Sequence, residues 1–203
     1  MIISALTRPE LLAFLAAARA GRERDWLLFA VMHNHALRVS EAVGDRYRDR
    51  KTKEWRELPG LLVGDVSAHG IRIVGLKGGE TVTQPLIAHP DPLLNEQPAL
   101  LKAVCFRLIS EKVFNIGRRQ VWELMQRYGE RANIPPEKRH PHALRHTCGK
   151  WMARQMTTPE GIKAVQAWMR HQDLGSTGIY LELSQEEVNA AVLPALGAET
   201  GAL

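Results

Sequence analysis

The segment from Asp25 to Asn34 is apolar almost all round its helical circumference, through the run WLLFAVM. A helix of this kind has no face suited to water, so other elements must cover it in a globular core. Before it, Thr7-Arg8-Pro9-Glu10 forms a capping box with proline in the first helical turn, and an apolar face including Leu11 and Leu15 follows. This part of the chain therefore predicts two helices, the second of them buried.

Further helices and one small sheet complete the expected fold. Three short strands are predicted at Leu61–Val66, Ile71–Val74 and Thr81–Leu86, separated by turns that contain glycine. The other helices are predicted from apolar spacing and from proline or polar caps, at 39–43, 97–110, 118–132, 142–155, 159–169 and 185–192. The expected fold class is mainly α with a small three-stranded antiparallel sheet.

Length and composition favour one globular domain. The chain has 203 residues, of which 45% are hydrophobic, and we expect 1–203 to form a single domain. No apolar run approaches the ~20 residues of a membrane-spanning helix, so no membrane association is expected. Cys105 and Cys148 lie far apart, which indicates free thiols in a reducing compartment. Lys and Arg number 27 against 22 Asp and Glu, which favours a polyanionic partner without proving one.

Several side chains suited to phosphate chemistry occur in characteristic local contexts. His142 and Arg145 are three residues apart in HPHALRHT, so on a helix they share one face. A guanidinium is always protonated, and its planar fork matches two oxygens of a phosphate. Taken singly, each candidate has an ordinary structural explanation. The other candidates stand in ALRVSE, GLKGGE and MRHQDLGSTGIY and are Arg38, Lys77, His171 and Tyr180.

In this order and in these contexts, the residues resemble the catalytic domain of the tyrosine recombinases, also called phage integrases. The resemblance runs from Thr7 to Glu187, and HPHALRHTCG looks particularly similar to the short, stand-alone fimbrial phase-switch recombinases. It implies a tyrosine recombinase catalytic-domain fold, that of DNA breaking and rejoining enzymes, with no N-terminal core-binding domain in this chain. The implied catalytic residues are Arg38, Lys77, His142, Arg145, His171 and Tyr180.

The resemblance implies site-specific DNA recombination, whether integration, excision or inversion, by transesterification through a 3′-phosphotyrosyl intermediate. Tyr180 would be the nucleophile, activated by nearby cations and a base because a free tyrosine has a pKa of about 10. Arg38 and Arg145 would hold the phosphate oxygens, and charge stabilisation of this kind is usually the largest catalytic effect. His142 would act as general acid or base, and Lys77 would protonate the leaving 5′ oxygen. The reaction would need no metal and no cofactor.

Two segments depart from the family pattern. His171, which the resemblance implies would hydrogen-bond the phosphate, follows Arg170 where the family has glycine. Glycine would permit a positive φ there, so the substitution puts the local backbone in question. Asp45–Glu57, DRYRDRKTKEWRE, makes the link after the first arginine motif longer than usual. It is interpreted either as a solvated, mobile loop or as an additional contact to the DNA backbone.

The expected partner is double-stranded DNA that carries recombination sites, on which homodimers and then tetramers assemble. Arg118, Arg119 and Gln120 open a predicted helix that in the family lies near the major groove, and such side chains suit base edges. Phosphate contacts, or a solvated helix start, fit the same residues. The resemblance also implies a cytoplasmic, nucleoid-associated protein encoded by a bacterium, a phage or another mobile element.

Histidine-rich segments raise a metal site as an alternative. His33-Asn34-His35 spells the name of a metal nuclease motif, but the residues of that motif are spread over a ββα unit, whereas these three are adjacent. His140, His142 and His146 could suggest zinc, but no pair of cysteines accompanies them. We therefore predict no metal.

Two other functions remain compatible with the sequence. A type IB topoisomerase-like nicking and closing enzyme would share the same chemistry. A non-catalytic DNA-binding regulator derived from a recombinase would account for Arg170, although all six implied catalytic side chains are present.

Overall fold

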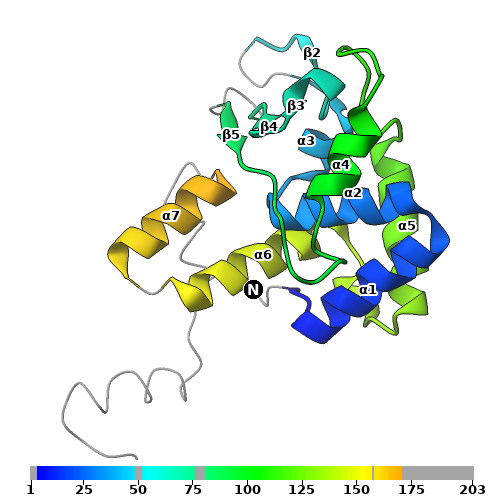
Figure 1. Ribbon diagram of the computed structural model, residues 1–203, viewed down its shortest axis with the longest axis vertical. Coiled ribbons are helices and arrows are strands. Elements are labelled where there is room, and N and C mark those ends of the chain that lie inside the picture. The colour runs from blue at the N-terminus through cyan, green and yellow to red at the C-terminus, as the bar shows by residue number, and fades with distance from the viewer. Residues whose placement is uncertain (1–3, 49–51, 76–80, 157, 171–203) are drawn as a thin grey trace, which may run out of the picture.

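The computed structural model describes residues 4–48, 52–75, 81–156 and 158–170 (Figure 1). The helices in these ranges are α1 (Arg8–Gly21), α2 (Glu23–Asn34), α3 (Val39–Val43), α4 (Gln97–Val104), α5 (Arg118–Arg131), α6 (Pro141–Gln155) and α7 (Pro159–Met169). The strands are β1 (Asp45–Arg48), β2 (Trp55–Leu58), β3 (Val66–Ser67), β4 (Gly70–Ile73) and β5 (Val82–Gln84). Two 3-10 turns are η1 (Val63–Asp65) and η3 (Pro136–Lys138). The expected fold class is confirmed, and a second, two-stranded sheet is added to it.

The helix α2 lies at the centre of the helical part, as its apolar circumference predicts. Every residue from Asp25 to His33 is buried, and α1, α3 and α6 pack against this helix. The predicted capping box of α1 is present, because the Thr7 hydroxyl accepts from the Glu10 amide at 3.4 Å and the Glu10 carboxylate accepts from the Thr7 amide at 2.7 Å. The helix cap and the buried helix that the sequence predicts are therefore both present in this part of the chain.

The three-stranded sheet has the order β3-β4-β5 and is antiparallel throughout. The prediction of a strand over Leu61–Val66 is wrong for most of its length, since only Val66 joins the sheet, opposite Ile71. The backbone before it pairs elsewhere, and the Val63 amide donates to the Glu111 carbonyl at 2.8 Å. The apolar run is therefore buried against the loop that follows α4. Its backbone forms hydrogen bonds with that loop and not with the sheet.

The segment Asp45–Glu57 is a β-hairpin, and the prediction of a mobile loop is wrong for its described residues. Strands β1 and β2 pair antiparallel, with Asp45 opposite Leu58. The Arg46 guanidinium lies over the Trp55 ring, 5.1 Å from its centroid. The charged composition did not predict strands, because these two strands lack an alternating apolar face. They are stabilised instead by cross-strand and cation–π contacts.

The helix α4 ends at Val104, earlier than the predicted Ser110. Phe106 has φ of 59°, a left-handed conformation that stops the helix. The Arg107 guanidinium then donates to the carbonyls of Ala103 at 3.3 Å and Lys112 at 2.6 Å, which holds the following loop against the helix end. The backbone at Phe106 therefore ends the helix, and the Arg107 side chain fixes the loop that follows.

The last three described helices begin and end within one residue of the predicted positions. Thr158 caps α7 as predicted, and its hydroxyl accepts from the Gly161 amide at 3.1 Å. The predicted helix at 185–192 lies outside the described residues.

The strands lie at one end of the structure, with α3 and α4 beside them (Figure 1). Figure 1 shows the strands at the top, α1, α5 and α6 below them, and α7 at one side beneath β5. Helix α7 packs on α6. Of the helices in the described ranges, none combines the length and the apolar character that crossing a membrane requires.

Candidate active site

Arg145 occupies a buried position on α6, with 4% of its surface exposed. Its two terminal nitrogens donate to the carbonyls of Ala36, after α2, and of Met169, at the end of α7. One guanidinium therefore joins three helical elements, and its orientation is fixed by backbone groups. Buried charge of this kind is stable only when its donors are satisfied.

Arg38 is the residue that precedes α3, and a third of its side chain is exposed. Its Nη1 donates to Glu41 Oε1 at 2.9 Å, and its backbone amide donates to Glu41 Oε2 at 2.7 Å. The Glu41 side chain is fully buried and holds Arg38 at both ends. The partly exposed guanidinium keeps donors for an anionic ligand.

His142 lies in the first turn of α6, one helical turn before His146, and their ring centroids are 6.2 Å apart. Its imidazole reaches solvent, but partial desolvation by the surrounding protein lowers its pKa, and Arg145 lowers it further. Arg38 also lowers this pKa. Arg38 and Arg145 are thus both close enough to His142 to lower the pKa of its imidazole, which favours the neutral form of the ring.

Arg170 is the C-cap of α7 and takes the left-handed conformation, with φ of 53° and ψ of 46°. This is the conformation that glycine would favour, and it costs an ordinary residue about 1–2 kcal/mol. Arg170 itself therefore takes the left-handed conformation that a glycine at this position would favour.

Three of the six expected catalytic residues lie outside the described residues: Lys77, His171 and Tyr180. Lys77 belongs to the segment between β4 and β5, and His171 directly follows Arg170. Their assignments remain predictions.

A groove that includes His142 contains two of the three expected DNA-contact residues, Arg118 and Arg119, at the start of α5. Arg118 Nη1 lies 2.5 Å from Asp45 Oδ2, and Arg119 Nε donates to Glu123 at 3.0 Å, while Gln120 is exposed. The groove is lined by Val39, Asp45, Arg118, Arg119, Trp122, His140, Pro141 and His142.

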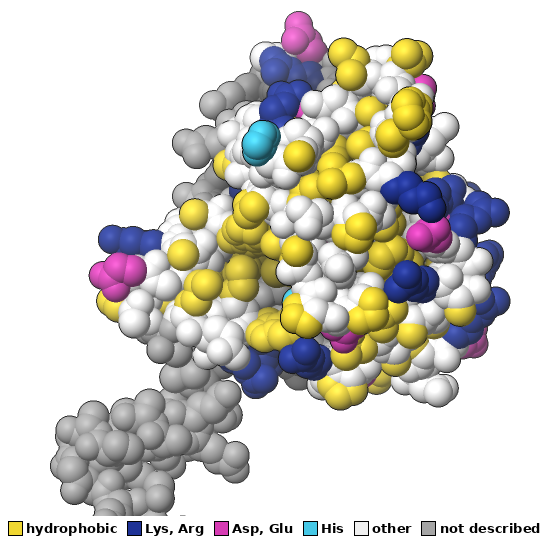
Figure 2. All heavy atoms as spheres, in the orientation of Figure 1, with side chains coloured by type: hydrophobic (Ala, Val, Ile, Leu, Met, Phe, Trp, Pro, Cys, Tyr) yellow, Lys and Arg dark blue, Asp and Glu magenta, His cyan; other side chains and the backbone are white. Residues whose placement is uncertain are grey.

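Trp122, which was not predicted from the sequence, lines this groove and is 52% exposed. Its spacing of one helical turn from Arg118 and Arg119 was the available signal, because residues three and four apart share a helix face. On the face in Figure 2, Lys and Arg gather along the edge over α1 and α5, and hydrophobic side chains cover the centre.

His33 and His35, of the histidine-rich segments, have contacts other than a metal ion. His33 Nδ1 donates to the Leu144 carbonyl at 3.3 Å, inside the core. The ring of His35 is buried between Gln84, at 2.9 Å from Nδ1, and the carboxylate of Glu96. Among the residues that the structure describes, no group of three or more His, Cys, Asp or Glu is placed to hold a metal ion.

With this fold and site established, comparisons with known proteins identify the family. The profile of the phage integrase family matches residues 4–187, and the chain belongs to this family. Tyrosine recombinase XerA of Thermococcus kodakarensis is 27% identical over 194 residues, covering 92% of this chain and 61% of the relative. Tyrosine recombinase XerD of Bifidobacterium longum is 28% identical over 187 residues, covering 89% of this chain and 58% of the relative. The chain spans about three fifths of the length of these relatives.

Solved structures support the same fold. A crystal structure of XerA recombinase superposes with a TM-score of 0.65 at 17% identity, over 94% of this chain and 62% of that one. XerH bound to palindromic difH substrate, in a post-cleavage complex, gives 0.68 at 20% identity, over 95% and 53%. A lambda integrase tetramer bound to a Holliday junction gives 0.59 at 16% identity, over 87% and 47%. The fold is that of the tyrosine recombinase catalytic domain.

Proposed function

We propose that this chain is the catalytic domain of a tyrosine-type site-specific DNA recombinase. The observation that carries the proposal is the convergence of Arg38, His142 and Arg145, which different elements of the fold supply. Two guanidiniums beside a neutral imidazole suit a phosphodiester, because they neutralise its non-bridging oxygens while the imidazole exchanges a proton. Membership of the phage integrase family supports the same conclusion.

The proposed reaction is a transesterification. The Tyr180 oxygen attacks the scissile phosphorus, and His142 accepts the tyrosine proton. The bond between phosphorus and the 5′ oxygen breaks, and Lys77 protonates that oxygen. A 3′-phosphotyrosyl ester and a free 5′ hydroxyl result. The 5′ hydroxyl of a partner strand then attacks the ester, which reverses the chemistry and releases Tyr180.

The arginines and His171 have supporting roles in this reaction. Arg38 and Arg145 hold the phosphate oxygens, and His171 donates a hydrogen bond to them. The phosphodiester bond is conserved as an ester in the intermediate, so the reaction requires no nucleotide hydrolysis. The groove at the start of α5 would receive the DNA, with Arg118, Arg119 and Gln120 in contact with it.

The proposed partners are double-stranded recombination sites and further copies of the protein. Exchange between two duplexes needs four cleaved strands, which fits a homodimer on each site and a tetramer on paired sites. Relatives crystallised as a lambda integrase dimer on a core site and as a tetramer on a Holliday junction support this assembly. Such a substrate implies a cytoplasmic, nucleoid-associated protein of a bacterium, a phage or a mobile element.

A suicide substrate tests the proposal. A nick near the cleavage site lets the short 5′ fragment diffuse away, which traps the covalent intermediate. We expect a covalent adduct with the wild-type protein and none with Tyr180→Phe, which should still bind the same DNA. If the wild-type protein forms no adduct, the result would support the alternative that the protein is a non-catalytic DNA-binding regulator. Adduct formation without strand exchange between two duplexes would support the topoisomerase-like enzyme.

A further inference from the structure

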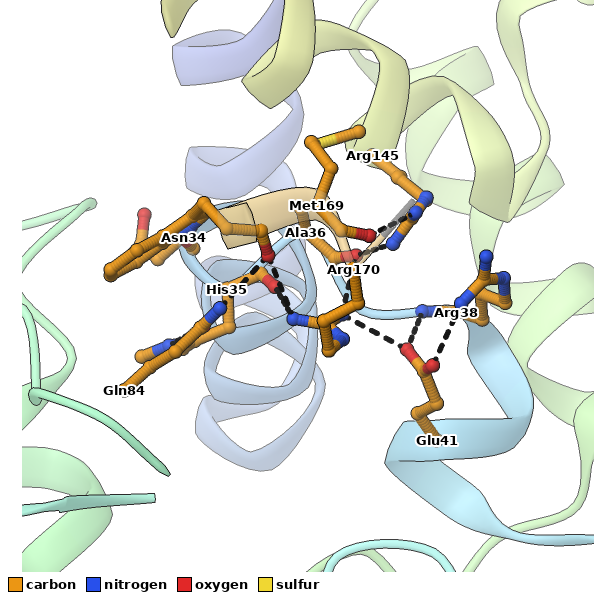
Figure 3. Close-up of polar contacts among 10 residues, drawn as sticks. Asn34, His35, Ala36, Arg38, Glu41, Gln84, Arg145, Met169 and Arg170 are labelled. Carbon is orange, nitrogen blue, oxygen red and sulfur yellow. Dashed lines mark hydrogen bonds and ion pairs between the residues drawn. The ribbon is translucent and has the colours of Figure 1, made fainter. Parts of the chain in front are cut away.

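Arg170 places a buried guanidinium behind the two candidate phosphate-binding arginines (Figure 3). Its side chain is 7% exposed. Its Nη1 donates to the carbonyls of His35 at 3.1 Å and Trp168 at 3.0 Å, and its Nη2 donates to the Ala36 carbonyl at 3.0 Å. These contacts tie the end of α7 to the turn that follows α2.

Two of the groups that Arg170 contacts also hold the candidate catalytic arginines. The Ala36 carbonyl accepts from both Arg170 and Arg145. The Glu41 carboxylate accepts from Arg170 Nη2 at 3.1 Å on Oε2 and from Arg38 Nη1 at 2.9 Å on Oε1. Arg170 is therefore connected to Arg145 through the Ala36 carbonyl and to Arg38 through the Glu41 carboxylate, as Figure 3 shows.

The charges in this cluster favour a role beyond packing. Glu41 is the carboxylate shared by Arg38 and Arg170, so two cations face one anion. A lone Glu41–Arg38 pair would be neutral overall and would oppose the attraction of Arg38 for a phosphate.

We propose that Arg170 is a positioning residue for cleavage of the scissile phosphate, an inference that rests on the proposed function. Through Glu41 it fixes Arg38 and offsets the negative charge behind it. It also holds the Ala36 carbonyl in place, and this carbonyl orients Arg145. The side chain thereby aligns both guanidiniums before DNA binds, and the glycine typical of the family could make neither contact.

The test is the first-order rate of covalent adduct formation at saturating nicked DNA, together with the Kd for the same DNA. Arg170→Asn keeps a residue that tolerates the left-handed conformation and removes the guanidinium. We expect the rate to fall roughly 10- to 100-fold, since small misalignments of catalytic groups have effects of that size. The Kd should change by less than about threefold, because the DNA-facing residues are untouched. Arg170→Lys should recover part of the rate, because it restores the charge without the fork.

A second substrate separates positioning from a general loss of structure. Replacing one non-bridging oxygen of the scissile phosphate by methyl removes the charge that Arg38 and Arg145 neutralise. The defect of Arg170→Asn should therefore be several-fold smaller, or about absent, on this methylphosphonate. An unfolded or distorted site would show the same defect on both substrates.

Arg107→Asn is the matched control. Arg107 also donates to three backbone carbonyls and one carboxylate, but in the loop after α4. The Arg107→Asn variant should lose some thermal stability, though less than Arg170→Asn because the Arg107 side chain is 30% exposed, and it should keep the wild-type cleavage rate. A wild-type rate in Arg170→Asn, or equal defects on both substrates, would overturn the inference while leaving the recombinase assignment intact. If Arg170→Asn does not fold, the cleavage rates of Arg170→Lys and the wild type on the two substrates are compared instead. An inactive wild-type protein would instead refute the proposed function.

Discussion

The Arg118 guanidinium lies 2.5 Å from the Asp45 carboxylate, which joins the first turn of α5 to the first residue of the hairpin β1–β2. Both residues line the groove that contains His142. The pair is partly exposed, so its own contribution to stability is small. Its consequence is geometric, because the hairpin begins beside the surface where we expect DNA.

The hairpin should contribute to DNA binding if it contacts the phosphate backbone. Arg46 and Arg48 are both exposed and, two residues apart on a strand, point to the same face. Replacing both by Gln should reduce the slope of log K against log salt by roughly 1 for each phosphate that these side chains neutralise in the wild type. Filter binding or fluorescence anisotropy over a salt series measures this slope. The double replacement Arg19→Gln and Arg24→Gln on α1 and α2 controls for net charge, and equal slopes in both double variants would mean that the hairpin is only solvated.

Substitutions of Arg38 and Arg145 should affect the stability of the protein differently, although we propose that both residues act in cleavage. Either substitution by Ala should lower the cleavage rate by about 10²–10³-fold, as when a donor to a developing charge is removed. Arg145→Ala should also lower the free energy of unfolding by about 1–3 kcal/mol, because it leaves the Met169 carbonyl without this donor in the core. Arg38→Ala should cost less than about 1 kcal/mol, since this side chain is partly exposed and Glu41 keeps its contact with Arg170. Urea unfolding of the two variants provides the comparison, and equal losses of stability would contradict the assigned packing.

Stability should decline in mild acid because of buried neutral histidine. Burial lowers the pKa of His33 from 6.5 to about 4. Between these values the unfolded chain binds a proton that the folded protein does not, so the free energy of unfolding falls as the pH drops. The loss is up to about 1.4 kcal/mol per pH unit for one such group.

The variant His33→Asn tests this pH dependence. It retains a side-chain donor for the Leu144 carbonyl but does not titrate, so its stability should vary less between pH 6.5 and about 4. His146, whose pKa is also lowered to about 4, would leave a residual slope. Urea unfolding at several pH values measures the effect, with the exposed His69→Asn as a control for the removal of a histidine. A slope identical to that of the wild type would show that His33 is not the titrating group.

Cleavage should survive chelation of metal ions. The proposed site supplies charge through arginine and lysine and the nucleophile through tyrosine, so no step calls for a divalent cation. Adduct formation on the suicide substrate should be unchanged by excess EDTA. If EDTA abolished adduct formation and magnesium or zinc restored it, a metal site would be indicated, with His140, His142 and His146 as candidate ligands.

The sequence by itself determined the features that depend on near neighbours in the chain. The Thr7–Glu10 capping box and the Thr158 cap each act within one helical turn, and the apolar circumference of α2 required burial wherever the helix was placed. Arg38 and Arg145 were recognisable for a similar reason, because each stands in a short and distinctive local context.

Tertiary structure alone decided features that depend on groups far apart in sequence. The β1–β2 hairpin replaced the expected loop through cross-strand pairing of charged and aromatic side chains, and the strand expected at 61–66 paired with the loop after α4. The sequence put the backbone at Arg170 in question, and only the tertiary structure shows its left-handed conformation and its contacts with Ala36 and Glu41. Its partners lie 129 and 134 residues away, and no local pattern encodes such a contact, because only the folded chain brings those carbonyl and carboxylate groups together.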